Sequence, residues 1–172
     1  MKIYHGLEEF IKVKNPVVTV GTFVGVHLGH GTIFKRMKKI AKDCDGETVV
    51  ITFHPHPRVV VSPDDIPLLL TALEEKLALL PRFFDGTVLL LEFNSELQNL
   101  SAEEFVRDIL VEKVHVKKLL VGYDHALGKN RGGKIVELTS FGTTYGFEVE
   151  VVGPITVDGL PVSSTKIRNA LT

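Results

Sequence analysis

The stretch Gly21-Thr22-Phe23-Val24-Gly25-Val26-His27-Leu28-Gly29-His30 decides how this chain folds. An apolar run at residues 17–20 leads into it, and an amphipathic, basic segment at residues 33–42 leads out of it. This order predicts a buried strand, a glycine-rich turn and a helix. The three glycines allow the backbone to bend tightly and to approach a ligand closely.

The start of the predicted helix is suited to bind an anion. Its first N–H groups lack partners within the helix, and the helix dipole is positive at this end. His27 and His30 lie beside those groups, and each can donate a hydrogen bond to a phosphate oxygen. A strand–glycine–helix junction occurs in any α/β protein, and one histidine there is often structural. Two histidines that frame a glycine favour a phosphate site, although the glycine spacing is not that of dinucleotide-binding proteins.

Composition excludes several classes of protein. The chain has 172 residues, 44% of them hydrophobic, and a formal net charge of -1. These values predict one globular domain over residues 1–172 and argue against a nucleic-acid binder, which is usually basic. No apolar run approaches the roughly 20 residues of a membrane helix, and no signal-peptide pattern is visible. One cysteine, Cys44, fits a reducing cytoplasm, where we expect the protein to act without a membrane partner. The oligomeric state is left open.

Strand and helix patterns alternate along the whole chain. Strands are predicted at residues 17–20, 47–53, 87–91, 116–121 and 147–152, with a short peripheral strand at 2–5. Helices are predicted at residues 33–42, 71–80, 101–111, 135–144 and 163–171, and a turn is predicted around Asp158-Gly159. Capping-box spacing marks two helix starts, Thr71 with Glu74 and Ser101 with Glu104. The alternation predicts an α/β fold with a doubly wound, mostly parallel five-stranded sheet and helices on both faces.

Ligands of such sheets bind at the carboxyl ends of the strands, near the point where the strand order reverses. This rule gathers four segments at one edge: residues 21–30, 54–58, 122–134 and the region before Ser163.

Three of these segments carry further polar groups. Residues 128–134 nearly match a P-loop, but Ile135 stands where a hydroxyl is needed. The composition of that loop is equally consistent with an anion-binding site and with an ordinary solvent-exposed loop. The segment from Ser163 to Arg168 is either an ordinary helix cap or a second anion site. His54 and His56 lack a third ligand nearby, so no metal site is predicted.

Several motifs resemble one family in order and along nearly the whole chain. The stretch 21–30 resembles the H-x-G-H signature of nucleotidyltransferases, and more narrowly the FMN adenylyltransferase module of bacterial FAD synthetases. Further segments that resemble this module are TFHPHP at 52–57, LLTALEEK at 69–76, LSAEEF at 100–105, VGYD at 121–124, GKNRGG at 128–133 and SSTKIR at 163–168. Val24 departs from the Asp of that family. No segment resembling its riboflavin kinase domain is present.

The resemblance implies the reaction of ATP with FMN to give FAD and pyrophosphate. It implies that His27 and His30 bind the ATP phosphates, and that Ser163, Ser164 and Arg168 hold the leaving pyrophosphate. The residues implied to bind nucleotide or flavin are Gly21, Thr22, Phe23, Gly29, Phe53, His54, Pro55, His56, Pro57, Gly122, Asp124, Asn130, Arg131 and Thr165. Magnesium is expected to arrive with ATP.

Two alternatives remain open at this point. Val24 motivates the first, a non-catalytic or weakened flavin- or nucleotide-binding relative. The second is a transferase that uses another phosphorylated acceptor.

Overall fold

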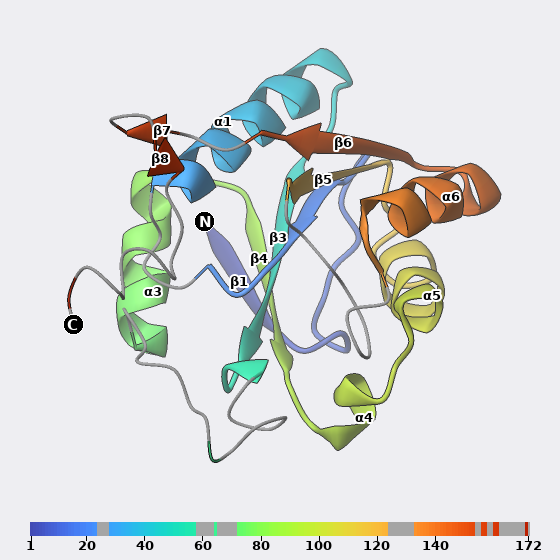
Figure 1. Ribbon diagram of the computed structural model, residues 1–172, viewed down its shortest axis with the longest axis horizontal. Helices are drawn as coiled ribbons and strands as arrows, with labels where there is room; N and C mark the ends of the chain where they lie inside the picture. Colours follow the sequence, from blue (N-terminus) through green and yellow to red (C-terminus); the bar gives the residue numbers. More distant parts are fainter. Residues whose placement is uncertain are drawn as a thin grey trace.

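Parallel strands form the centre of the computed structural model (Figure 1). The structure describes residues 1–23, 28–57, 64, 72–123, 133–153, 156–157, 160–161 and 171. Among these residues six strands form one sheet in the order β1-β4-β3-β2-β5-β6, and every neighbouring pair is parallel. The strands are β1 Lys2–His5, β2 Val17–Val20, β3 Thr48–His54, β4 Thr87–Glu92, β5 Lys118–Gly122 and β6 Glu148–Val152.

The predicted α/β doubly wound sheet is confirmed, with one more strand than the five predicted. The additional strand is β1, which the sequence places at the periphery. It pairs with β4, from Lys2 opposite Thr87 to His5 opposite Leu90, and becomes the edge of the sheet. A four-residue strand carries too weak a pattern to reveal that it joins a sheet whose other members lie far along the chain.

Helices cover both faces of this sheet (Figure 1). They are α1 Leu28–Asp43, α3 Leu73–Leu79 with the 3-10 turn η1 Leu80–Arg82, α4 Ser95–Gln98, α5 Ala102–Phe105 continued by the π-helix η2 Val106–Val111, and α6 Ile135–Tyr145. A small antiparallel hairpin, β7 Thr156–Val157 and β8 Leu160–Pro161, agrees with the turn predicted around residues 158–159. The predicted closing helix lies outside the described residues, except for residue 171. No helix in the described part of the chain is long and apolar enough to cross a membrane.

Alternate side chains of the strands enter two separate cores. In β2, Val18 and Val20 pack with η2 and α6, whereas Val17 packs with α1 and the 3-10 turn after α3. All four residues of β2 are buried. Burial on both faces is typical of a strand inside a parallel α/β sheet.

The predicted capping box at Ser101 and Glu104 is correct, whereas the start of α3 has only one of the two hydrogen bonds of a capping box, one residue later than predicted. The Ser101 hydroxyl accepts from the Glu104 N–H at 3.1 Å, and the Glu104 carboxylate accepts from the Ser101 N–H at 3.3 Å. Helix α3 begins one residue later than the predicted Thr71 cap requires. Ala72 precedes it, and the Ala72 N–H donates to the Glu75 carboxylate at 3.1 Å.

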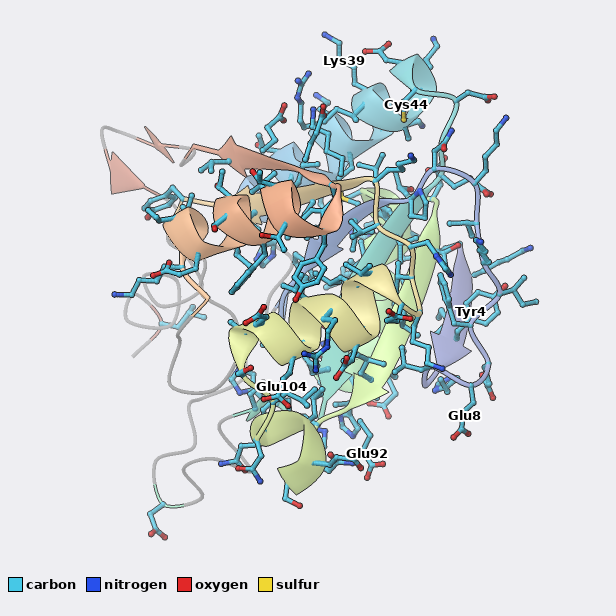
Figure 2. The ribbon with its side chains drawn as sticks, turned by 90° about the vertical axis from the view of Figure 1, so that its right-hand side faces the viewer. Tyr4, Glu8, Lys39, Cys44, Glu92 and Glu104 are labelled. Carbon is cyan, nitrogen blue, oxygen red and sulfur yellow. The ribbon has the colours of Figure 1, made fainter. Side chains whose placement is uncertain are left out.

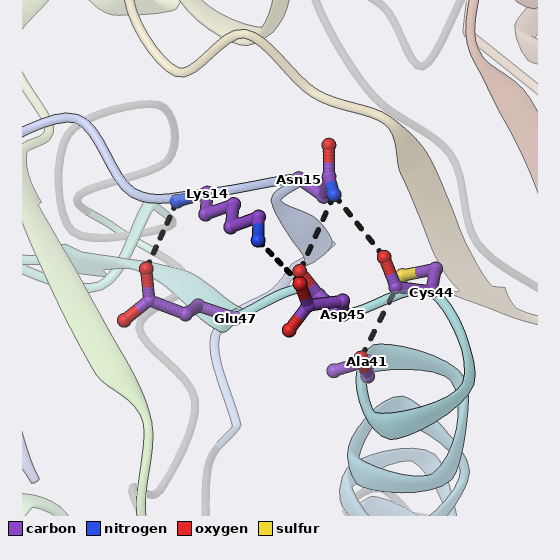
Figure 3. Close-up of polar contacts among 6 residues, drawn as sticks. All are labelled: Lys14, Asn15, Ala41, Cys44, Asp45 and Glu47. Carbon is purple, nitrogen blue, oxygen red and sulfur yellow. Dashed lines mark hydrogen bonds and ion pairs between the residues drawn. The ribbon is translucent and has the colours of Figure 1, made fainter.

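The segment before β2 is fastened to the loop between α1 and β3 (Figure 3). The Lys14 N–H donates to the Glu47 carboxylate at 2.9 Å, and the Lys14 ammonium pairs with Asp45. The Asn15 amide donates to the carbonyl groups of Cys44 and Asp45, at 3.1 and 3.3 Å. These contacts close the amino end of the sheet and set where β2 begins.

Topology then places the functional end of the molecule. The chain passes from β2 to β3 and β4 on one side and returns to β5 on the other side, so the strand order reverses at β2. All carboxyl ends lie at one edge because every pair is parallel. Figure 2 shows Glu92, the last residue of β4, at the opposite end of the molecule from Lys39 and Cys44. A ligand site is therefore expected beyond the end of β2.

Replacing Gly46 by alanine is expected to destabilise the fold, because a Cβ there would lie 2.4 Å from the Asn15 carbonyl oxygen and 3.0 Å from the Cys44 sulfur. Overpacking of this kind costs about 1–3 kcal/mol of unfolding free energy, measurable by urea titration. Gly153→Ala is the control, because a Cβ there meets nothing within 4 Å. Equal stability of the two variants would contradict the role given to this close approach.

Candidate active site

The turn after β2 has a constrained backbone. The Gly21 N–H donates to the Ile51 carbonyl at 3.0 Å, which continues the pairing of β2 with β3. Two residues later Phe23 has φ +49°, in the left-handed region that costs a residue with a Cβ about 1–2 kcal/mol. Its ring is nevertheless 4% exposed and packs against Phe34 of α1 at a centroid distance of 5.3 Å. The Phe23 ring therefore belongs to the core between the sheet and α1.

His30 lies in the first turn of α1, directly after this turn. Its imidazole meets the Phe23 ring edge-to-face, with centroids 5.0 Å apart and planes at 80°. The first turn of α1 contains no acidic residue, so no carboxylate of the helix neutralises the positive end of its dipole. A half-buried imidazole and a helix start thus occupy the edge where the sequence predicts a phosphate site.

Lys76 of α3 is not among the residues to which the sequence motifs assign a role. Its side chain is buried, with 7% exposure, and its Nζ donates to the Thr22 carbonyl at 3.1 Å, to the Thr52 Oγ1 at 3.1 Å and to the Phe53 carbonyl at 3.5 Å. The Thr52 hydroxyl itself donates to the Thr22 carbonyl at 3.3 Å. One ammonium therefore joins the turn after β2 to the end of β3. A sequence signal for this residue exists, because Lys76 interrupts the apolar helical spacing of Leu73, Leu77 and Leu80.

Burial lowers the pKa of Lys76 to about 8, because desolvation penalises the charged form. None of the ion pairs among the described residues includes Lys76. An ammonium has three donors, and three acceptors surround this one. The protonated form therefore has an acceptor for each of its three donors, and no carboxylate of the described residues pairs with it.

The end of β3 supplies the second predicted segment. The Phe53 ring packs against Phe93 at 5.8 Å and against Phe105 at 6.4 Å, and the His54 carbonyl accepts from the Phe93 N–H at 3.1 Å. The His54 side chain is exposed, and the three residues after it, Pro55, His56 and Pro57, are half-buried. Because β3 is next to β2, this segment lies beside the turn that contains Phe23.

An ion pair fixes α1 on the other side of β2. The Arg36 guanidinium binds the Glu150 carboxylate through two nitrogens, at 2.7 and 2.9 Å, and Lys118 lies 3.6 Å from the same carboxylate. Hydrogen bonds from Arg36 hold the pKa of Glu150 below its ordinary value. This pair joins α1 to β6, so α1 is attached across the point where the strand order reverses.

The structure brings together only part of the predicted site. Gly21, Thr22, Phe23 and His30 lie in one turn and the helix start after it, and Gly122 ends β5 on the neighbouring side. Gly29 lies in α1. Phe53 and residues 54–57 lie at the end of β3 and directly after it. Eight predicted residues lie outside the described part of the chain: His27, Asp124, Asn130, Arg131, Ser163, Ser164, Thr165 and Arg168. Val24 also lies there, and the roles of all these residues remain predictions.

Stability is expected to depend on the titration of Lys76. The folded pKa of about 8 lies below the ordinary 10.5, so the unfolded chain binds more protons between these values. The contribution of Lys76 to the unfolding free energy therefore rises as pH increases from about 8 to 10.5, with a slope of at most about 1.4 kcal/mol per pH unit. Urea titrations of the protein and of Lys76→Met across this window isolate the effect from other groups. A stability difference that stays flat would show that folding does not lower the pKa of Lys76, and one that falls with pH would show that folding raises it.

Comparison with known proteins agrees with this geometry. The sequence pattern of the family described as FAD synthetase matches residues 11–166. A bifunctional riboflavin kinase/FMN adenylyltransferase of Buchnera aphidicola is 34% identical over 99% of this chain and 55% of its own length. A protein of the same description from Pseudomonas fluorescens is 41% identical over 90% of this chain and 50% of its own length. The chain thus spans about half the length of the curated relatives that it matches.

Solved structures show the same architecture. A crystal structure described as a macrolide-efflux protein from Streptococcus pneumoniae superposes with a TM-score of 0.83 and 26% identity, over 98% of this chain and 56% of that one. A pantoate-beta-alanine ligase from Francisella tularensis superposes with a TM-score of 0.67 and 15% identity, over 97% of this chain and 72% of that one, which indicates a shared fold. With the family pattern covering residues 11–166, the chain belongs to the FAD synthetase family.

Proposed function

We propose that this chain transfers the adenylyl group of ATP to FMN and so forms FAD and pyrophosphate. One observation carries the proposal: the turn after β2, followed by the start of α1 with His30, lies where the strand order reverses. Family membership supports the same activity, and the names of the relatives include it. Riboflavin kinase activity, the other half of those names, is not proposed for this chain.

The reaction needs positioned groups more than reactive ones. A phosphate oxygen of FMN attacks the α-phosphorus of ATP, and the bond from that phosphorus to the bridging oxygen breaks. Pyrophosphate leaves with the electron pair, so no protein nucleophile is required. Hydrogen-bond donors aimed at the α-phosphate stabilise the negative charge that develops in the transition state. His30 and the N–H groups at the start of α1 are suited to this task, and magnesium is proposed to enter with ATP as part of the substrate.

The remaining assignments follow from the motifs and are proposals for mutagenesis. His27 is proposed to act with His30 on the ATP phosphates, and the 163–168 segment to hold the leaving pyrophosphate. The segments at residues 53–57 and 122–131 are proposed to shape the flavin site. A cytoplasmic location follows from the same small-molecule substrates and remains a prediction.

Incubation with ATP, magnesium and FMN is expected to yield FAD, detected by chromatography. Riboflavin in place of FMN is expected to yield neither FMN nor FAD, because the transfer needs a phosphate nucleophile. Nucleotide binding without FAD formation would instead support the non-catalytic alternative that Val24 motivates. Turnover with a different phosphorylated acceptor would support the other alternative.

Loss of the His30 imidazole is expected to lower turnover by roughly a hundredfold, the effect of losing one preorganised donor. Two variants separate chemistry from packing. His30→Ala removes both the donor and the ring, whereas His30→Phe keeps a ring against Phe23 and removes the N–H donors. Both variants are expected to lose similar turnover in a steady-state assay of FAD formation.

The control for this test is His115→Asn. His115 lies before β5, at the amino end of the sheet, and has φ +60°, which asparagine tolerates. Near-normal turnover of His30→Phe would show that His30 acts by packing and would refute its role at phosphate.

A further inference from the structure

We propose that Lys76 is a positioning residue for the transfer reaction, acting through the turn after β2 on His30. The inference rests on the proposed function and adds a residue from α3, an element that carries none of the site residues assigned from the motifs. Three links carry the inference: the hydrogen bond from the Lys76 ammonium to the Thr22 carbonyl, the peptide bond between Thr22 and Phe23, and the ring contact between Phe23 and His30.

The first contact joins two strand ends. Lys76 Nζ lies 3.1 Å from the Thr22 carbonyl oxygen in the turn after β2, and 3.1 Å from the Thr52 hydroxyl in β3. Thr52 donates in turn to the same carbonyl, at 3.3 Å. The Thr22 carbonyl thus accepts two hydrogen bonds from groups that are both buried. A peptide held from one side by two donors has little freedom to rotate.

The second step is a property of the peptide bond. The carbonyl of Thr22 and the N–H of Phe23 belong to one planar group and point in opposite directions. Rotation of that plane changes φ of Phe23, which is +49°. Strained values of this kind persist only where surrounding contacts determine them. By holding the carbonyl, Lys76 and Thr52 keep Phe23 in this conformation and turn its N–H away from α3.

The third step reaches His30. The Phe23 ring packs against Phe34 of α1 on one side and meets the His30 imidazole edge-to-face on the other. A different φ at Phe23 would move this ring, and the imidazole would lose the surface that orients it. A misplacement of about 1 Å in a positioning contact can cost about a hundredfold in rate.

Stability alone gives a poor account of a lysine here. Lys76 occupies a core position of α3, and burial lowers its pKa, so the charged form is kept against a desolvation cost. A methionine here would avoid this cost, but it would remove one donor from the Thr22 carbonyl and one from the Phe53 carbonyl. The groups that need this ammonium are the backbone carbonyls at the ends of β2 and β3, which border the candidate site.

The experiment compares Lys76→Met with the unchanged protein and with Lys39→Met, an exposed lysine of α1. Three quantities are measured: the thermal unfolding midpoint, kcat with the KM values for FAD formation, and the histidine ring signals in NMR spectra. The His30 signal is identified by its disappearance in His30→Phe. His5 and His115, which lie outside the chain of contacts, serve as internal references.

For Lys76→Met we expect the His30 signal to move, kcat to fall about tenfold or more, and KM for ATP to change less than threefold. The protein should remain folded at the assay temperature, and Lys39→Met should match the unchanged protein. An unmoved His30 signal, or unchanged kcat in a folded variant, would overturn the proposal. A kcat that falls only in proportion to the unfolded fraction would also overturn it.

Thr52→Val covers the case in which Lys76→Met does not fold. It removes the hydroxyl shared by Lys76 and the Thr22 carbonyl while nearly preserving side-chain shape. The same displacement of the His30 signal with a smaller loss of kcat is expected, and no displacement would refute the proposal. If the unchanged protein forms no FAD, the proposed function fails by itself. The His30 signal still reports whether Lys76 positions that residue.

Discussion

The burial of β2 on both faces, in the middle of a parallel sheet, constrains every feature that follows it. Its residues 17–20 are all buried, and as in every strand of this parallel sheet the chain leaves β2 at the carboxyl edge. The strand order reverses at β2 because the chain continues to β3 and β4 on one side before it returns to β5 on the other. The turn after it must therefore fit between the ends of β3 and β5. A site at this point can be reached by loops from several strands, as doubly wound folds require for ligand binding.

The fit of that turn depends on one buried ammonium. Carbonyl groups at strand ends lose their ladder partners where the chain departs from the sheet, and in a buried place they need donors. Lys76 supplies three donors from a neighbouring helix, at the cost of desolvating a charge. An apolar side chain would avoid this cost, but the Thr22 and Phe53 carbonyls would lose the hydrogen bond that each accepts from Lys76. The left-handed Phe23 and its contact with His30 lie directly beyond this joint.

The sequence predicts features that depend on neighbouring residues better than features that depend on residues far apart in the chain. The Ser101–Glu104 capping box is local and is correct in both of its hydrogen bonds. Helix α3 begins one residue later than its local pattern predicts, after Ala72, which has no side chain that could cap it. Strand β1 is only four residues long, and its partner lies some 85 residues away in sequence. Arg36 belongs to the basic segment at residues 33–42, and only the structure shows that it pairs with Glu150 of β6.

By itself the sequence determined the fold class, the strand–turn–helix unit and the family, because each is encoded in short patterns of residue type and spacing. The same patterns placed His30 at a helix start. Only the tertiary structure decided that Phe23 combines a left-handed backbone with a ring buried in the core. It also decided that Lys76 donates a hydrogen bond to the carbonyl of Thr22, the preceding residue. The physical reason is that these contacts join residues up to 54 positions apart. The cost of burying a lysine depends on everything packed around it, and no local pattern records those surroundings.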